Sequence, residues 1–216
     1  MGIPLPSSLA CQPSWILVLF FLGLLHVTKL CISVLHWSYS YFLRPAKDLK
    51  ATYGSWALIT GSTDGIGKAT AFELARKNLD LVLVGRNHSK LATVSTQIQD
   101  KFRNVKIKNV VIDLSRDLLE GMKVLLEAVE GLDVGVLVNN AGVANPTPLF
   151  LHEGEVELWV EMMRVNLEAT TVVTRALLPG MIEKKRGAIL NIGSASALEA
   201  CMPSFPLFAV YTATKA

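Results

Sequence analysis

Residues 60–67 read TGSTDGIG, a glycine-rich turn that follows a short apolar run and precedes a segment with helical spacing. The glycines have no Cβ, so the backbone can come close to a pyrophosphate, and free N–H groups at the start of the next helix attract its charge. The spacing G-x-x-x-G-x-G differs from the commoner G-x-G-x-x-G, and a plain glycine-rich turn is the alternative interpretation. We expect the following residues to bind a dinucleotide: Gly61, Ser62, Gly65, Ile66 and Gly67.

From residue 55 onward, strand and helix patterns alternate along the chain. Strands are predicted at 55–60, 79–84, 105–112, 134–138 and 188–192, and helices at 66–77, 89–101, 118–129 and 155–178, the last one closed by Pro179-Gly180. Such alternation indicates a parallel sheet with right-handed crossovers and helices on both faces. The sequence therefore predicts an α/β fold with a Rossmann-type, doubly wound sheet that binds its ligand at the carboxyl ends of the strands.

The turns after the next three strands carry side chains that suit a dinucleotide. Arg86 stands in the region where an NAD site would place a carboxylate. Because a guanidinium binds a 2′-phosphate well, NADP(H) is favoured over NAD(H), with a merely solvated Arg86 as the alternative. Asp113 could accept a hydrogen bond from the adenine amine. Small residues at Asn140, Ala141 and Gly142 let the chain pass close to a ribose, and asparagine amides can fix neighbouring strand ends.

Beyond the fifth strand, Ser194 is followed by Tyr211 and Lys215, which share one face if Tyr211 opens a helix. A free phenol titrates at about pH 10, and a nearby ammonium lowers that pKa, so Tyr211 could act as an acid or base near neutral pH. The Ser194 hydroxyl could hold a carbonyl oxygen on which charge develops. The spacing Y-x-x-x-K arises often by chance, and its position after the fifth strand is what gives it value.

The first 53 residues have a different composition from the rest. Residues 15–25 contain no polar side chain, and Lys29 is the one charged residue before Leu35. A helix over 15–35 would span about 30 Å, the thickness of the hydrocarbon layer. We predict a tail at 1–14, a transmembrane anchor at 15–35, a juxtamembrane linker at 36–53 and a globular domain at 54–216. The alternatives are a cleaved signal peptide, which usually begins with a basic region, and a hydrophobic hairpin or interfacial helix.

Composition and charge exclude several classes of protein. The chain has 216 residues, of which 51% are hydrophobic and 18% charged, the opposite of a disordered chain. The net charge of +3 and the lack of a basic stripe give no support for nucleic-acid binding. The basic residues Arg44, Lys47 and Lys50 all follow the apolar run, so the positive-inside bias places the globular domain in the cytosol. Cys11, Cys31 and Cys201 match no metal-site spacing, and their odd number favours a reducing compartment.

Taken together and in order, the motifs from residue 54 to 216 resemble the short-chain dehydrogenase/reductase family. They are TGSTDGIG at 60–67, Asp113-Leu114, NNAG at 139–142, Val165-Asn166-Leu167, Ser194 and YTATK at 211–215. The resemblance implies a catalytic tetrad of Asn166, Ser194, Tyr211 and Lys215. In that scheme Tyr211 donates the proton in reduction and Ser194 positions the substrate carbonyl. Lys215 holds the nicotinamide ribose and tunes Tyr211, and Asn166 supports a water in the proton relay.

Within that family, three further segments are similar to the membrane-anchored, plant very-long-chain 3-oxoacyl-CoA reductases: ACQP at 10–13, YFLRP at 41–45 and YGSWA at 53–57. This resemblance implies NADPH-dependent reduction of a long-chain acyl-CoA at the endoplasmic reticulum membrane, with other fatty acid elongation proteins as partners. Two alternatives stay open. One is a steroid or other lipid ketone as the substrate, and the other is a catalytically impaired relative that acts as a binding subunit of an elongation complex.

Some features depart from the family pattern. Ser194 and Tyr211 are further apart than usual, so residues 203–206 should bulge out, and Ser196 is an alternative to Ser194. Glu199, within 198–202, puts a carboxylate where relatives are apolar. The sequence stops one residue after Lys215, whereas the family's fold continues with the rest of that helix, two strands and a substrate loop. We therefore expect the 216-residue chain, taken literally, to have little reductase activity.

Overall fold

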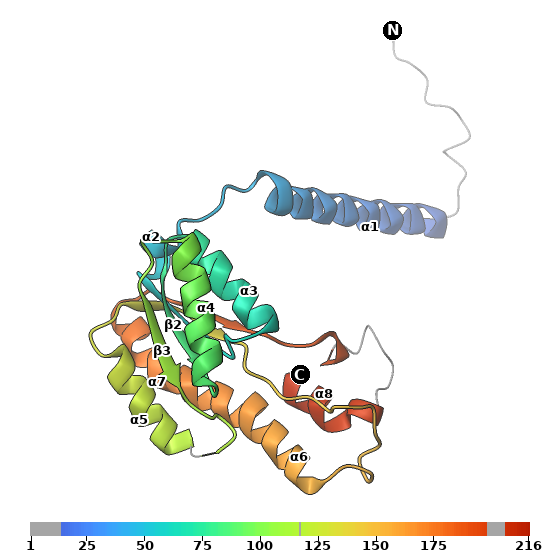
Figure 1. Cartoon of the computed structure of the whole chain (residues 1–216). Coiled ribbons are helices and arrows are strands. Elements are labelled where there is room, and N and C mark those ends of the chain that lie inside the picture. Colours follow the sequence, from blue (N-terminus) through green and yellow to red (C-terminus); the bar gives the residue numbers. More distant parts are fainter. Residues whose placement is uncertain (1–13, 117, 198–205) are drawn as a thin grey trace. The chain divides into compact units, whose positions relative to one another are not determined.

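The computed structural model describes residues 14–116, 118–197 and 206–216, and its contacts divide the chain into two units with the boundary between Lys47 and Asp48. The predicted features at Cys11, Glu199, Cys201 and 203–205 lie outside the described residues. The first unit contains helix α1 (Ser14–Ser38), which continues into the π-helical turn η1 (Tyr39–Leu43) (Figure 1). Among the described residues, one helical stretch, Trp15–Leu43, is long and apolar enough to cross a membrane.

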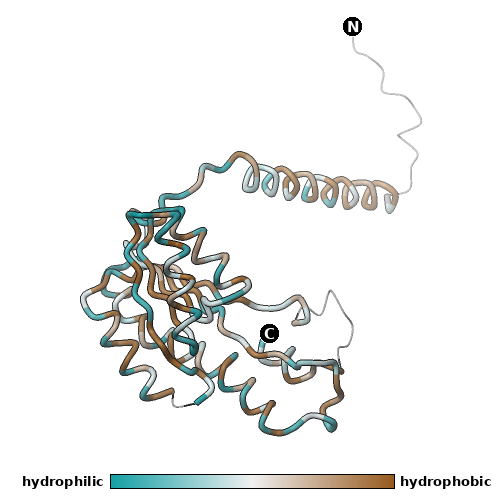
Figure 2. Tube along the Cα trace, viewed as in Figure 1, coloured by the Kyte–Doolittle hydropathy of each residue, from teal (hydrophilic) through white to brown (hydrophobic). Residues whose placement is uncertain are grey.

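Helix α1 is hydrophobic over most of its surface (Figure 2). Its C-terminal end carries an aromatic cluster, in which the ring centroid of Trp37 lies 5.0 Å from that of Tyr41 and 5.9 Å from that of Phe42. Tryptophan and tyrosine concentrate where a membrane meets water, because one part of each ring system is apolar and another forms hydrogen bonds. This end of α1 therefore has the composition of an interfacial segment.

The second unit is built on a parallel sheet, as the alternating pattern predicts. Its strands are β1 (Trp56–Thr60), β2 (Asp80–Gly85), β3 (Ile107–Val111), β4 (Val134–Asn139) and β5 (Ala188–Asn191). Within the described residues the sheet has five strands in the order β3-β2-β1-β4-β5. The chain adds strands on one side of β1 and then crosses to β4 on its other side. The switch point between β1 and β4 is where open parallel sheets bind ligands.

Helices connect these strands, and asparagine or aspartate side chains begin several of them. The bounds are α2 (Leu49–Tyr53), α3 (Gly65–Arg76), α4 (His88–Lys101), α5 (Leu118–Val129), α6 (Val156–Met162), the π-helical η2 (Met163–Ala169), α7 (Thr170–Glu183), the short 3₁₀ turns η3 (Ala195–Ala197) and η4 (Pro206–Phe208), and α8 (Ala209–Lys215). Asp64 accepts from the Gly65 N–H at the start of α3, and Asn87 accepts from the Lys90 N–H at the start of α4. Such caps satisfy N–H groups that have no partner within the helix.

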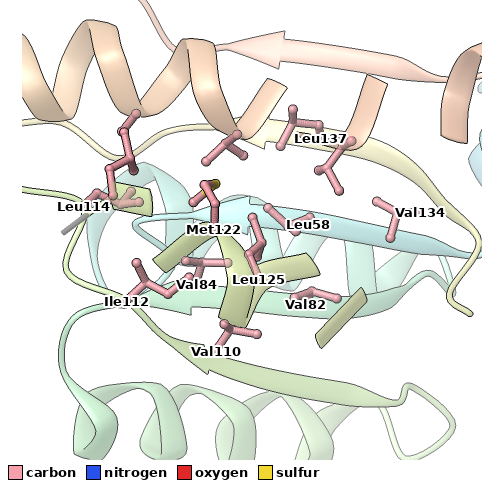
Figure 3. Packing of buried hydrophobic residues seen from close by; sticks show 14 of the residues in the cluster. Leu58, Val82, Val84, Val110, Ile112, Leu114, Met122, Leu125, Val134 and Leu137 are labelled. Atoms are coloured by element: carbon pink, nitrogen blue, oxygen red, sulfur yellow. The ribbon is translucent and has the colours of Figure 1, made fainter. Parts of the chain in front are cut away.

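The core forms two layers, one on each face of the sheet, because successive strand residues point to opposite sides. On one face, Leu58, Val82 and Leu137 pack against Met122 and Leu125 of α5 (Figure 3) and against buried residues of α7. The other face is covered by α3 and α4, whose buried residues contact the intervening positions of β1 and β2. The central strands are thus packed between helices on both faces, and their carboxyl ends lead into the turns that position the site.

Two segments differ from the sequence prediction. The helix expected to close at Pro179-Gly180 runs on to Glu183, with Pro179 inside α7. Leu177 and Met181 are both buried in the core, so packing on either side of the proline holds the helix together despite the missing N–H. The segment predicted as linker contains helix α2, and its Tyr53 packs against the core of the globular unit.

Candidate functional site

A cavity of about 440 Å³ opens at the carboxyl ends of the central strands. It brings together residues from the turns that follow β1, β2, β3 and β4, although these turns are far apart in the sequence. The predicted cofactor residues that line it are Gly61, Gly65, Arg86, Asp113, Asn140, Ala141 and Gly142. The parallel topology therefore assembles most of the predicted dinucleotide site in one place.

The glycine turn needs its glycines for two different reasons. Gly61 and Gly65 have φ values of +64° and +52°, which L-residues with a Cβ adopt at a cost. A Cβ on Gly61 would lie 2.8 Å from the Cα of Ala141, and a Cβ on Gly67 would overlap the Gly61 carbonyl oxygen and the Asn140 amide. Apart from its chain neighbours and its own helix backbone, no atom of the described residues lies within 4 Å of a Cβ built on Gly65, so the turn is open there for a ligand.

The turns after β1 and β4 are tied together by Asn140 and Thr60. The Asn140 side-chain amide donates to the carbonyl oxygens of Thr60 and Gly61, at 3.0 and 2.9 Å. The Thr60 hydroxyl oxygen accepts from the backbone N–H groups of Asn140 and Ala141, at 3.0 and 3.1 Å. The expectation that asparagine amides fix neighbouring strand ends is confirmed. Asn140 thus holds the glycine turn in place from behind.

Four predicted cofactor residues are not among those that line the cavity: Ser62, Ile66, Gly67 and Lys215. Ser62 is fully buried, and both its hydroxyl and its backbone N–H donate to the carbonyl oxygen of Val84, at 3.3 Å each. Its side chain joins the turn to β2 instead of lining the cavity. Ile66 is exposed and is not among the described lining residues. Gly67 contributes through the close packing described above.

Charged side chains of alternating sign lie at and beside the part of the cavity formed by the turns after β2 and β3. Arg86 is largely exposed and lies 3.8 Å from the Glu161 carboxylate of α6. Asp113 accepts hydrogen bonds from the Ser115 hydroxyl and backbone N–H, at 2.7 and 3.0 Å, and lies 3.4 Å from Arg116. The Ser115 hydrogen bonds, with Arg86 and Arg116 nearby, lower the pKa of Asp113 below its ordinary value. Asp113 is therefore a carboxylate at neutral pH and can accept from an amine.

Lys215 reaches the carboxyl end of β5. Its ammonium donates to the carbonyl oxygen of Ile192 at 3.1 Å, and a Cβ on Gly142 would lie 3.1 Å from the same nitrogen. Burial lowers the pKa of Lys215 from its ordinary value. The YTATK motif and the NNAG turn, predicted separately, therefore meet at Gly142.

Asn166 connects the same region to the long helix. It is buried within η2; its Oδ1 accepts from the Val143 N–H at 2.8 Å, and its Nδ2 donates to the Val143 carbonyl oxygen at 2.9 Å. The Nδ2 also donates to the Thr214 hydroxyl at 2.9 Å. Single π-turns within α-helices are often found at functional sites. Here the π-turn carries the asparagine that joins the turn after β4 to helix α8.

Ser194 and Tyr211 lie on neighbouring segments. The hydroxyls of Ser194 and Ser196 are 2.9 Å apart, so the two candidate serines share one hydrogen bond. Tyr211 is in the first turn of α8, which packs against η3, the turn that directly follows Ser194. The ring of Tyr211 packs edge-on against Phe208, with centroids 6.5 Å apart.

Sequence reasoning missed several residues that hold the site together. Thr60 and Thr214 lie within the quoted motifs but were given no role there, and Glu161 lies outside every motif, because their roles depend on which segments meet in space. Asn139 could have been suspected from the paired asparagines, and its amide donates to Thr174 and to Asn191 of β5. These residues position the cavity wall.

Comparison with known proteins places these features in a family. The sequence profile described as short chain dehydrogenase matches residues 55–216. A very-long-chain 3-oxoacyl-CoA reductase-like protein of Arabidopsis thaliana is 46% identical over 206 residues, which are 95% of this chain and 64% of that protein. A very-long-chain 3-oxoacyl-CoA reductase of Coprinopsis cinerea is 38% identical over 95% of this chain and 60% of its own length. The chain thus spans less than two thirds of these curated relatives.

A solved structure supports the same assignment. The short-chain dehydrogenase from Sphingobium yanoikuyae in complex with NADPH has a TM-score of 0.65 and 32% identity, covering 74% of this chain and 60% of its own. The present site fits such a cofactor, since it has an open glycine turn, a cavity at the switch point lined by the cationic Arg86, and the Lys215 ammonium beside the lining residue Gly142. From the profile match and this arrangement, the chain belongs to the short-chain dehydrogenase family of NAD(P)-dependent oxidoreductases.

Proposed function

We propose that the protein is an NADPH-dependent reductase that converts a very-long-chain 3-oxoacyl-CoA into the 3-hydroxyacyl-CoA in fatty acid elongation. The observation that carries this proposal is the meeting of Lys215, Asn166 and the NNAG turn at one end of the sheet, with Tyr211 on the same short helix as Lys215. The similarity to reductases named for this substrate supports the choice of acyl-CoA. The activity concerns the whole protein, of which the chain spans the part described above.

The cofactor would be held by the glycine turn at its phosphates, by Asp113 at the adenine and by Lys215 at the nicotinamide ribose. When bound, NADPH supplies the hydride that reduces the ketone carbon. Arg86 is the residue that favours the 2′-phosphate, because its exposed guanidinium lines the cavity and has Glu161 as a distant partner at 3.8 Å. The chain's own residues bind and orient the reactants around this step.

The proton in the reaction would come from Tyr211. Its hydroxyl donates the proton to the ketone oxygen, and the Ser194 hydroxyl donates a hydrogen bond to the same oxygen as charge develops on it. The Lys215 ammonium, one helical turn away, favours the phenolate that remains. Asn166 would keep α8 in register with the turn after β4 and support the water of the proton relay.

The membrane is the second part of the proposal. Helix α1 would anchor the protein in the endoplasmic reticulum membrane with the catalytic domain in the cytosol, where other fatty acid elongation proteins would be its partners. An apolar helix with an aromatic cluster and basic residues at one end supports this. A long acyl chain partitions into a bilayer, so an anchored enzyme meets its substrate at the membrane surface.

The test is NADPH oxidation by membranes that carry the full-length protein. We expect oxidation to depend on a very-long-chain 3-oxoacyl-CoA and to fall about a hundredfold or more in Tyr211→Phe. Tyr39→Phe, in η1 of the first unit, is the matched control and should keep full activity. Faster turnover of a steroid ketone would refute the proposed substrate. Undiminished turnover by Tyr211→Phe, or co-sedimentation with membranes other than the endoplasmic reticulum, would refute the mechanism or the location.

A further inference from the structure

Helix α1 carries a polar stripe that a simple lipid anchor does not need. Its members are His26, Lys29, Ser33 and His36, which follow one another at intervals of three, four and three residues. At about 100° per residue these side chains fall within an arc of about 80° on the helix surface. Residues spaced three and four apart lie on one face of a helix, and such a face forms the contact line when two helices pack along each other. In Figure 2 the brown tube of α1 is interrupted by paler and teal segments.

The polar stripe is exposed, whereas a polar residue outside it has a hydrogen-bond partner within α1. Thr28 lies off the stripe, and its hydroxyl donates to the Leu24 carbonyl oxygen at 2.8 Å, so it is satisfied within α1. All members of the stripe are exposed in the described unit, which contains no second helix of comparable length for them to face. The stripe is therefore the part of α1 that is costly in lipid and is left without protein cover by the described residues.

Lys29 lies well inside the apolar helix. It lies about 12 Å along the axis from Trp37, at the aromatic end, and about 21 Å from Trp15, near the other end. Side chains of an α-helix point back toward its N-terminus, so Lys29 points toward the more distant end. A charge that stays within the hydrocarbon layer needs a partner of opposite charge, and such residues usually face another protein helix.

We propose that the stripe of α1 binds a transmembrane helix of another protein that carries an aspartate or glutamate at the depth of Lys29. This inference rests on the membrane anchor in the proposed function. The carboxylate would pair with the Lys29 ammonium, and the imidazoles and hydroxyl of the stripe would form further hydrogen bonds along the same face. A helix with this chemistry covers every polar group of the stripe.

A second copy of the chain does not satisfy the same requirement. Helix α1 contains no aspartate or glutamate. Two copies inserted in the same direction would place Lys29 against Lys29 along a shared stripe, which costs free energy because like charges repel in a medium of low dielectric constant. The positive charge of Lys29 therefore favours a helix of another protein over a second copy of α1.

The experiment uses the full-length protein reconstituted in phosphatidylcholine vesicles, with a fluorophore attached at position 44. The probes are labelled transmembrane peptides of leucine and alanine with one glutamate at the depth of Lys29, and matched peptides with glutamine or leucine there. Energy transfer measures association. We expect the glutamate peptide to bind about tenfold more tightly than the leucine peptide. Lys29→Leu should abolish this difference and Lys29→Arg should keep it, while Thr28→Val, off the stripe, should leave it unchanged.

Three results would overturn the inference. These are equal binding of the glutamate and leucine peptides, an unchanged preference in Lys29→Leu, and stronger association between two labelled copies than with any peptide. Extraction with alkaline carbonate distinguishes a failure of the proposed membrane anchor from a failure of the inference about the stripe. If the protein leaves the membrane, the anchor and the inference both fail. If it stays and shows no preference for glutamate, the inference alone fails. Cofactor binding should be the same in Lys29→Leu, since Lys29 lies outside the catalytic unit.

Discussion

Replacing Gly67 with alanine tests whether the glycine turn is built by close packing. Gly67 lies in the first turn of α3, where the helical backbone accepts an alanine, so the cost comes from space. A Cβ there would overlap the Gly61 carbonyl oxygen and the Asn140 side-chain amide, neither of which can move freely. That amide is fixed by its hydrogen bonds to the carbonyl oxygens of Thr60 and Gly61.

The magnitude follows from these contacts. Forcing a methyl group into a packed site costs about 1–3 kcal/mol, and each lost hydrogen bond of Asn140 costs about 1 kcal/mol. The better helix propensity of alanine returns up to about 1 kcal/mol. We therefore expect Gly67→Ala to lower the free energy of unfolding by about 2–4 kcal/mol. It should also weaken NADPH binding, since the turn must open away from Asn140.

The assay is urea unfolding of the full-length protein followed by tryptophan fluorescence, with Trp56 and the buried Trp159 as reporters in the globular unit. Gly180→Ala is the matched control. It lies within α7, and apart from the backbone of α7 itself and its chain neighbours no described atom comes within 4 Å of a Cβ built there, so alanine should raise the free energy of unfolding by up to about 1 kcal/mol. If Gly67→Ala unfolds at the same urea concentration as the wild type, the packing argument is wrong.

Three other substitutions test separate parts of the site and fold. Arg86→Ala should raise the Kd for NADPH about 10- to 100-fold in a fluorescence titration and leave NADH binding unchanged; an equal loss for both would exclude a 2′-phosphate contact. Thr214→Ala removes the hydroxyl that accepts from Asn166, so kcat for acyl-CoA reduction should fall about tenfold with little change in KM. Thr214→Ser should restore it, and failure of that rescue would contradict the positioning role. The hydrogen bond from Lys184, together with the Ser55 N–H and Arg186, lowers the pKa of Asp133 below its ordinary value of 3.8. The ionised carboxylate therefore stabilises the fold at pH values above 3.8. This stabilisation is lost as the pH falls through the lowered pKa of the folded state. Asp133→Asn should therefore lower the free energy of unfolding by about 1–2 kcal/mol at neutral pH, and the difference should shrink once the pH drops below 3.8; a gap that does not vary with pH would refute this.

The order of strands and helices could be predicted because four of the strands are short apolar runs, β3 lies in a stretch where lysines alternate with branched apolar residues, and each strand ends at or just before a glycine, asparagine or aspartate. The central strands β1, β2 and β4 are buried on both faces, so they could be recognised without an alternation of polar residues. Pro179 shows the limit of local rules. A proline is a helix breaker in isolation, yet the burial of Leu177 and Met181 on either side keeps α7 continuous. That outcome depends on tertiary packing, which has no local signal.

The site residues that lie in the turns after the strands could be predicted from the sequence. Parallel strands bring their carboxyl ends to one edge, so Gly61, Arg86, Asp113 and Gly142 had to meet once the topology was assigned. The supporting bonds were not predictable. Asn166 reaches both Val143 and Thr214 because η2 is a π-turn, and the sequence over 163–169 carries no residue pattern that marks one.

Ser62 shows why a residue's place in a motif does not decide its role. It lies between Gly61 and the cavity-lining Thr63, so its position suggests contact with a phosphate. The φ of +64° at Gly61 turns the chain so that the next hydroxyl points to the Val84 carbonyl oxygen, where it is fully buried. Within the turn, cavity-lining residues thus stand beside one that fastens the turn to β2. By fastening the turn to β2, Ser62 keeps the open glycine turn ordered before a dinucleotide binds. Less conformational entropy is then lost on binding.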